Sequence, residues 1–139
     1  LTPGSKELIA AVHEVGGKVA AVSGGFSQVL DPLAKSLGLD YWKANSLEVR
    51  DGFLTGGVTG EIVDAQAKAH SLNAWCQSMG LPLEQSIAIG DGANDILMLK
   101  ASGYAIGFRP KNVLREHADL IIEENSLLSV VELVKLRSS

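Results

Sequence analysis

Two aspartates in a glycine-rich segment are the side chains in this sequence best placed to do chemistry. Asp91 and Asp95 lie in the segment Gly-Asp-Gly-Ala-Asn-Asp at residues 90–95, directly after the run Ser-Ile-Ala-Ile at residues 86–89. An apolar run that ends in a glycine turn is typical of a buried parallel strand, and a helical pattern follows from Ile96. The two carboxylates are therefore expected at the carboxyl end of a strand and in the first turn of a helix, where open parallel sheets bind ligands.

The same segment has the chemistry to bind a divalent metal ion and a phosphate together. Its glycines let main-chain N–H groups approach a ligand, and the start of a helix favours an anion. A carboxylate beside an anion is repulsive unless a cation lies between them, so Asp91 is a candidate ligand of Mg²⁺ and Asn94 can bond a phosphate oxygen. The alternative is that Asp and Asn only cap the helix. The complete pattern D-G-x-N-D directly after a strand favours the binding site.

A second strand–glycine–helix pattern places a hydroxyl group at the end of another strand. Ser23 and the N–H groups of Gly24 and Gly25 can donate hydrogen bonds to phosphate oxygens. Farther along the chain, Lys68 offers a positive charge that could neutralise a phosphate in a transition state, and Asp95 could pair with Lys68 and hold it in place. Taken singly, Ser23 is equally well explained as a helix cap, and Lys68 as a solvated helix lysine. Their joint placement favours a site.

Other glycine-rich motifs do not fit. The segment at residues 90–95 is not G-x-G-x-x-G, because its sixth residue is Asp95, whose charge would repel a pyrophosphate. No G-K-[ST] follows a glycine loop, and no G-x-S-x-G nucleophile elbow is present. The sequence therefore points away from dinucleotide binding, P-loop chemistry and serine hydrolysis.

Strands alternate with helices along the chain. Helical spacing and end signals predict helices at residues 3–15, 26–37, 62–79, 96–100, 111–116 and 127–136. Strands are predicted at residues 18–22, 41–44, 86–90, 104–108 and 120–123, and a β-hairpin is predicted at residues 47–58 with its turn at Asp51-Gly52. This order predicts an α/β fold with a Rossmann-like parallel sheet, helices on both of its faces and an added β-hairpin.

Composition excludes several classes of function. With 139 residues, 46% of them apolar and 20% charged, the chain is globular and one domain at most. A formal charge of −4 argues against binding to nucleic acid, which favours basic surfaces. Neither a membrane-spanning run nor a signal peptide is visible. The single cysteine, Cys76, permits no internal disulfide and shares an apolar helix face with Trp75. We therefore expect it in the core of a protein of the reducing cytoplasm.

Four stretches resemble the phosphoserine phosphatase family of the haloacid-dehalogenase-like hydrolases. They are V-S-G-G-F at residues 22–26, A-N-S-L-E-V-R-D-G-F-L-T-G at residues 44–56, I-V-D-A-Q-A-K-A at residues 62–69 and I-G-D-G-A-N-D at residues 89–95. The resemblance implies that Ser23 and Lys68 bind phosphate, that Asp91 ligates Mg²⁺, that Asn94 contacts the phosphoryl group and that Asp95 supports the site. It also implies that an aspartate takes the phosphoryl group from phosphoserine and that water then hydrolyses the aspartyl-phosphate.

The motif that supplies this nucleophilic aspartate in the family, D-x-D-x-T, is missing from the sequence. No Asp occurs before Ser23, and Asp31 and Asp40 fall on a helix flank and in a loop. The family places the motif on the central strand, upstream of a cap that selects the substrate. We therefore expect residues 1–139 to be the C-terminal part of one core domain, inactive alone and completed by an upstream segment or another chain. The missing strand is expected to split the sheet and expose residues 19–22 and 87–89.

Two other functions remain open at this point. A related phosphatase for another small phosphomonoester fits the same residues, because the part of the family that reads the substrate is absent. A catalytically silent module that binds phosphate or a partner protein also fits. The resemblance favours hydrolysis of phosphoserine, the last step of serine biosynthesis.

Overall fold

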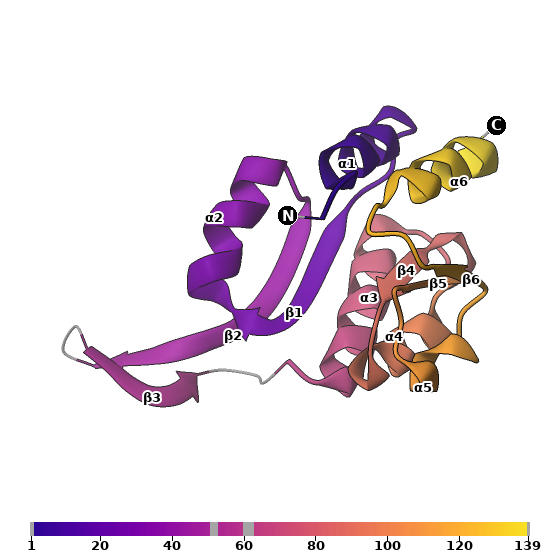
Figure 1. The fold of residues 1–139 in the computed structure, drawn as a ribbon. Helices are drawn as coiled ribbons and strands as arrows, with labels where there is room; N and C mark the ends of the chain where they lie inside the picture. Colours follow the sequence, from indigo (N-terminus) through magenta and orange to yellow (C-terminus); the bar gives the residue numbers. More distant parts are fainter. Residues whose placement is uncertain (1, 51–52, 60–62, 139) are drawn as a thin grey trace.

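The computed structural model describes the main chain of residues 2–50, 53–59 and 63–138, with side chains at residues 2–23, 30–45 and 63–136. Helices and strands alternate along the chain (Figure 1). The helices are α1 (Ser5–Glu14), α2 (Ser27–Leu37), α3 (Ala65–Met79), α4 (Ile96–Ala101), α5 (Asn112–Arg115) and α6 (Leu128–Ser138). The strands are β1 (Ala20–Phe26), β2 (Tyr41–Arg50), β3 (Phe53–Thr59), β4 (Ile87–Gly90), β5 (Tyr104–Phe108) and β6 (Leu120–Ile122). Short 3-10 turns at Leu83–Gln85 and Ala93–Asp95 precede β4 and α4.

The strands form two separate three-stranded sheets. In the first sheet, β1 pairs in parallel with β2, and β2 pairs antiparallel with β3. In the second sheet, β4, β5 and β6 are all parallel. Within the described part of the chain no ladder joins β1 to β4, so the expected split of the parallel sheet is present. The fold is the α/β class that the sequence predicts.

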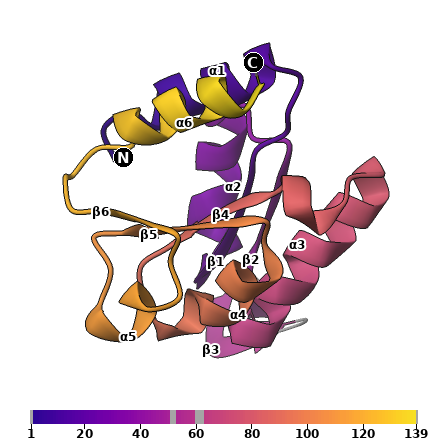
Figure 2. The ribbon, with the colours of Figure 1, turned by 90° about the vertical axis from the view of Figure 1, so that its right-hand side faces the viewer.

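Helices cover both faces of the second sheet. Because side chains alternate along a strand, Ile87 and Ile89 of β4 face one way and Ala88 faces the other. The first face packs against α1 and α6 in a core cluster built around Ile106, Ile122, Val130 and Val134. The opposite face packs against α4 and α5 in a cluster that includes Ala88, Met98, Leu99, Ala105 and Leu114. Figure 2 places α1 and α6 side by side on one side of this sheet, with α4 and α5 on the other.

Helix α3 contacts the parts of the molecule that carry each of the two sheets. It packs against α4 on one side and contacts β1 on the other. Val22 of β1 and Leu72 of α3 both reach the core cluster beneath α4. Cys76 of α3 is buried as predicted, and burial raises the pKa of its thiol, which suits a core residue better than a nucleophile. Among the helices of the described residues, none combines the length and the apolar character needed to cross a bilayer.

The first sheet departs from the prediction at its element boundaries. β1 does not end at Val22 but continues through Ser23, Gly24 and Gly25 to Phe26. Helix α2 therefore begins at Ser27, one residue after its predicted start. The pairing register of β1 with β2 shifts between Val22 and Phe26, as in a β-bulge, which absorbs the glycines into the strand. β2 likewise runs unbroken through the segment that joins the predicted strand and hairpin. The antiparallel pairing of Arg50 with Phe53 confirms the hairpin, whose predicted turn, Asp51-Gly52, lies outside the described residues.

Candidate functional site

The turn after β4 is organised by the carboxylate of Asp95. Its Oδ1 accepts a hydrogen bond of 2.8 Å from Nζ of Lys68. Its Oδ2 accepts main-chain N–H groups of Asp91 at 3.0 Å and of Gly92 at 3.4 Å. Asp95 thus ties the strand end, the glycine turn and helix α3 together with one side chain.

Asp95 and Lys68 form a buried ion pair, and the pairing expected from the sequence is present. The two side chains are only 9% and 8% exposed. Burial by itself would raise the pKa of Asp95, but the hydrogen bond from Lys68, the N–H groups and the positive charge outweigh it, so the pKa is lowered. The Asp95 carboxyl is therefore charged at neutral pH, and the ion pair holds Lys68 in one orientation.

Helix α3 delivers Lys68 to this position from its first turn. Asp64 caps the helix by accepting the N–H of Ala67 at 2.9 Å. This cap explains why the helix begins at Ala65, and the predicted start at residue 62 lies outside the described residues. Lys68 lies one turn later, on the face that also buries Ala67 and Ser71. The solvated lysine considered from the sequence is thus excluded.

Gly90 is required for close contact between the strand end and Asp95. A Cβ atom at Gly90 would lie 2.5 Å from Cβ of Asp95, closer than side chains approach one another. At Gly92 the nearest atom to such a Cβ, Oδ1 of Asn94, would be 3.4 Å away. The first glycine therefore admits Asp95 to the strand end, whereas an added Cβ at the second would only make an ordinary contact with Asn94.

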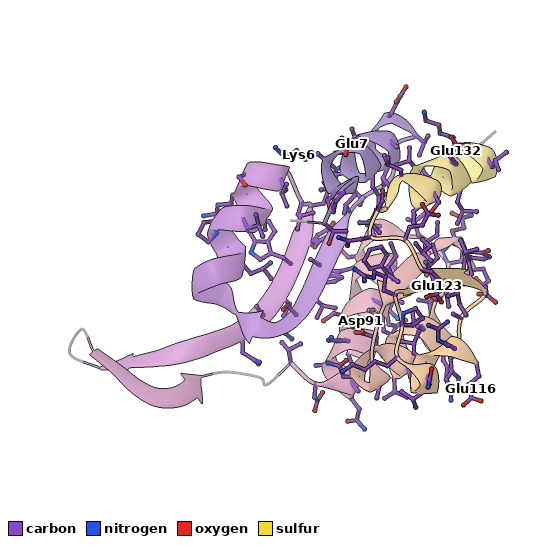
Figure 3. All side chains as sticks on the ribbon, viewed as in Figure 1. Lys6, Glu7, Asp91, Glu116, Glu123 and Glu132 are labelled. Atoms are coloured by element: carbon purple, nitrogen blue, oxygen red, sulfur yellow. The ribbon has the colours of Figure 1, made fainter. Side chains whose placement is uncertain are left out.

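Asp91 and Asn94 are exposed at the same turn, in contrast to buried Asp95. Asp91, labelled in Figure 3, lies in the loop between β4 and α4. Since Asp95 commits both of its oxygens to Lys68 and to the turn, Asp91 is the carboxylate here that is available to a metal ion. Mg²⁺ commonly takes one or two carboxylates and completes its shell with water and phosphate. Asp91 fits as one ligand of such a site, and the described residues contain no cluster of three or more His, Cys, Asp or Glu side chains for a metal.

Ser23, Gly24 and Gly25 lie in β1, in the first sheet. Ser23 is half-buried, and Val22 beside it packs against the core cluster that also includes Ala88 of β4. The side-chain description does not extend to residues 24–29. The structure therefore brings Lys68, Asp91 and Asp95 together around one turn, with Asn94 in the same turn. The convergence of Ser23, Gly24 and Gly25 on that turn stays a prediction.

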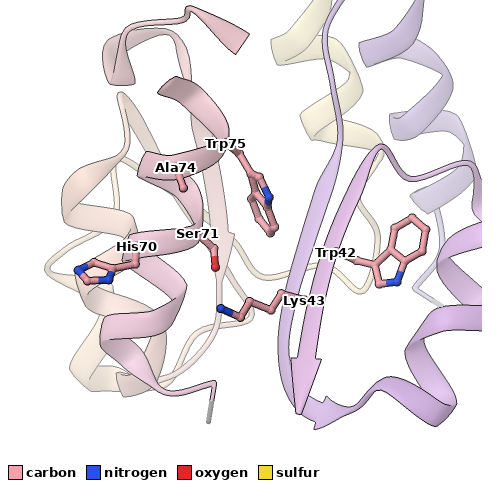
Figure 4. A pocket seen from close by; sticks show the side chains of 6 residues that line it. All are labelled: Trp42, Lys43, His70, Ser71, Ala74 and Trp75. Atoms are coloured by element: carbon pink, nitrogen blue, oxygen red, sulfur yellow. The ribbon is translucent and has the colours of Figure 1, made fainter. Parts of the chain in front are cut away.

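A cavity of about 360 Å³ lies elsewhere, between β2 and α3 (Figure 4). Its lining includes Lys43, His70, Ser71 and Trp75, and Tyr41 stacks on Trp75 beside it. None of the residues proposed from the sequence lines this cavity. The chemistry favours the turn after β4, because a buried cation and an exposed carboxylate meet there.

Sequence reasoning missed the loop after β5, residues 109–111. The main-chain N–H of Lys111 donates a hydrogen bond of 2.8 Å to the carbonyl oxygen of Asp91. No motif marks this loop. The available signal was the predicted strand at residues 104–108, since the carboxyl ends of neighbouring parallel strands share one edge of a sheet.

The chain belongs to the haloacid dehalogenase-like hydrolase family, whose model matches residues 1–100. Within that family it is similar to phosphoserine phosphatases. The phosphoserine phosphatase of Streptococcus thermophilus is 50% identical over 131 residues, which cover 94% of this chain and 61% of that protein. The phosphoserine phosphatase of Streptomyces coelicolor is 48% identical over 96% of this chain and 33% of that protein.

A solved structure described as a phospho-aspartyl intermediate analogue of phosphoserine phosphatase has the same fold. It aligns with a TM-score of 0.89 and 42% identity, over 95% of this chain and 63% of that one. The chain thus spans between about one third and two thirds of the length of these relatives.

Proposed function

We propose that residues 1–139 are the C-terminal part of the core domain of a Mg²⁺-dependent phosphoserine phosphatase. The observation that carries the proposal is the buried Lys68–Asp95 pair beside the exposed carboxylate of Asp91, at the carboxyl end of a parallel strand. The names of the relatives, all at high coverage of this chain, support phosphoserine as the substrate.

The phosphate of the substrate would be held by groups from α3, from the turn after β4 and from β1. Lys68 supplies a fixed positive charge, and Asn94 can donate to a phosphate oxygen from the exposed turn. Ser23 and the N–H groups of Gly24 and Gly25 would close the other side of the anion. Asp95 orients Lys68 and does not touch the substrate, so its role is positioning.

Asp91 would hold Mg²⁺ as one of its ligands. Bound there, the ion would neutralise negative charge on the phosphoryl group as the reaction proceeds. A single carboxylate is a sparse ligand set, so the remaining ligands would come from water, from the substrate phosphate and from residues outside this chain.

The nucleophile is proposed to lie outside this chain. An aspartate there would attack the phosphorus, the bond from phosphorus to the serine oxygen would break, and water would then cleave the aspartyl-phosphate to inorganic phosphate. The separation of the two sheets supports a place for that aspartate on a further strand between β1 and β4. Such a strand would cover half-buried Val22, Ile87 and Ile89, at about 25 cal/mol for each Å² of apolar surface removed from water.

The product side of this reaction is serine and phosphate, which would place the protein at the last step of serine biosynthesis. The single cysteine is buried and has no partner for an internal disulfide, which supports a location in the reducing cytoplasm.

Phosphate release from phosphoserine in the presence of Mg²⁺ tests the proposal. One sample is the 139-residue chain, and the second is the same chain preceded by a D-x-D-x-T segment, either encoded upstream or taken from the Streptococcus thermophilus relative. We expect turnover only from the longer protein, and Asp91→Asn in it should abolish Mg²⁺-dependent turnover. Activity of the short chain would refute the account of the nucleophile.

Other small phosphomonoesters serve as the comparison substrates. Preference for one of them over phosphoserine would establish a related phosphatase. Binding of phosphate without turnover by the longer protein would establish a silent module.

A further inference from the structure

The loop between β5 and α5, residues 109–111, is attached directly to the candidate site. β4 and β5 are parallel neighbours, with Gly90 opposite Gly107, so both strands end at the same edge. There, the N–H of Lys111 donates to the carbonyl oxygen of Asp91 at 2.8 Å. The proposed metal ligand and the lysine are thus joined through their main chains.

A left-handed backbone and two contacts fix the loop in this position. Arg109 has a left-handed backbone with φ of 44°, which is uncommon for a residue other than glycine. Its N–H donates to the carbonyl oxygen of Ile122 at 2.6 Å, which holds that conformation against β6. Pro110 is buried against Gly107, where an added Cβ would lie 3.1 Å from the proline ring. Strained backbone that is held by its surroundings is a feature of functional sites.

The side chain of Lys111 is free to meet a ligand at that edge. Lys111 is exposed, and within the described part of the chain no carboxylate forms an ion pair with it. Its Cα lies within about 4 Å of the Asp91 carbonyl oxygen, from the 2.8 Å hydrogen bond and the length of the N–Cα bond. The four-carbon stem of a lysine therefore suffices to carry the ammonium group over the turn.

We propose that Lys111 is a further substrate-binding residue, whose ammonium group takes an anionic group of the ligand while its N–H fixes the Asp91 turn. The inference rests on the proposed function. Both the phosphate and the carboxylate of phosphoserine offer the required anion. Lys68 is buried and committed to Asp95, so exposed Lys111 supplies a second cation for a ligand that carries more than one negative charge.

The first test compares Lys111→Met with Lys100→Met in the phosphatase completed by the D-x-D-x-T segment. Lys100 is also exposed, in the last turn of α4, and serves as the matched control. Lys111→Met should raise KM for phosphoserine about tenfold, the size of one charge-assisted hydrogen bond, with kcat changed by less than about twofold. Lys111→Arg should restore most of the affinity. A KM equal to that of Lys100→Met overturns the proposal.

Two further ligands identify which anion Lys111 meets. O-phosphoethanolamine is phosphoserine without its carboxylate, and inorganic phosphate is the phosphoryl group alone. A loss of affinity for all three ligands assigns the phosphate, whereas a loss confined to phosphoserine assigns the carboxylate. Unchanged affinity for every ligand in Lys111→Met refutes substrate binding by this residue.

A proline variant isolates the main-chain hydrogen bond. The φ of Lys111 is −68°, which suits proline, so Lys111→Pro removes the N–H as well as the charge. Titration calorimetry with Mg²⁺ should show binding about threefold weaker than in Lys111→Met, the loss expected for one modest hydrogen bond. Equal Mg²⁺ affinity in the two variants overturns the positioning role. A completed wild-type protein that neither binds phosphate nor hydrolyses phosphoserine overturns the proposed function, and this inference with it.

Discussion

The two strand–glycine–helix units of this chain are built alike in sequence but fixed in different ways. After β4 the backbone turns at once. The buried carboxylate of Asp95 accepts hydrogen bonds from the turn and from Lys68. After Val22 the strand β1 instead runs on through its glycines with a shift of register. The carboxylate that fixes the main chain of this unit, Asp40, lies at the other end of the strand, where it accepts the N–H of Val19.

The two units therefore differ in how far their charges and main chain are fixed within the chain itself. The β4 unit has its charges paired and its main chain held before any ligand arrives, which is the arrangement that electrostatic catalysis requires. The β1 unit is fixed where its strand begins. Under the proposed function, the groups of the β4 unit would be preorganised for a phosphate, whereas those of the β1 unit would depend on a further strand between the sheets.

The largest effect should come from removing the charge at the centre of the β4 unit. Asp95→Ala leaves the ammonium group of Lys68 buried without its partner, which costs about 3–5 kcal/mol of the free energy of unfolding. Urea unfolding of the chain measures this loss. Asp91→Ala, an exposed carboxylate of the same turn, should change stability by less than about 0.5 kcal/mol. Equal losses in both variants would mean that Asp95 does not organise the turn.

The two glycines of the turn should respond differently to an added methyl group. Gly90→Ala places a Cβ 2.5 Å from that of Asp95, so the pair must move apart, at about 1–3 kcal/mol. Gly92→Ala meets its nearest atom at 3.4 Å with φ of −131°, which any residue adopts, and should leave stability within about 0.5 kcal/mol of the wild type. Thermal unfolding of both variants checks the ranking. A more damaging Gly92→Ala would contradict the geometry.

The β4 unit could be predicted from the sequence because its interactions are local or follow from charge. Asp95 reaches the N–H of Asp91 four residues earlier, a distance that the motif itself encodes. The pairing of Lys68 with Asp95, 27 residues away, was predicted because the two opposite charges were expected at one edge of the sheet. The depth of burial of Lys68 was not predictable, since a lysine in a helix pattern is usually solvated.

Other features depend on neighbours that no local pattern reveals. Strand propensity predicted that β1 would end before Ser23, because glycine weakens a strand. Pairing with β2 instead extends the strand to Phe26. The bond from Lys111 to Asp91 depends on β5 lying beside β4, so it becomes visible only when the sheet is assembled.

A smaller effect is expected on acidification, where the stabilisation that the charge of Asp95 gives to the fold should decrease. The pKa of Asp95 is lowered on folding, so its charged form stabilises the fold fully above the unfolded pKa, about 3.9. That contribution is lost as the pH falls through the lower folded value. The difference in unfolding free energy between the wild type and Asp95→Asn should therefore be constant from about pH 7 to pH 5 and shrink below about pH 4. A difference that grows in acid would mean that the pKa is raised instead.

The smallest effect is expected at the start of β1. Asp40 accepts the N–H of Val19 at 2.7 Å and pairs with Nε2 of His13 at 2.8 Å, but its side chain is 22% exposed and that of His13 38%. Water can replace much of what Asp40→Ala removes, so we expect a loss of about 1 kcal/mol, measured by urea unfolding beside Glu14→Ala as an exposed acidic control. A loss as large as that of Asp95→Ala would mean that the β1 unit is held by charge as firmly as the β4 unit.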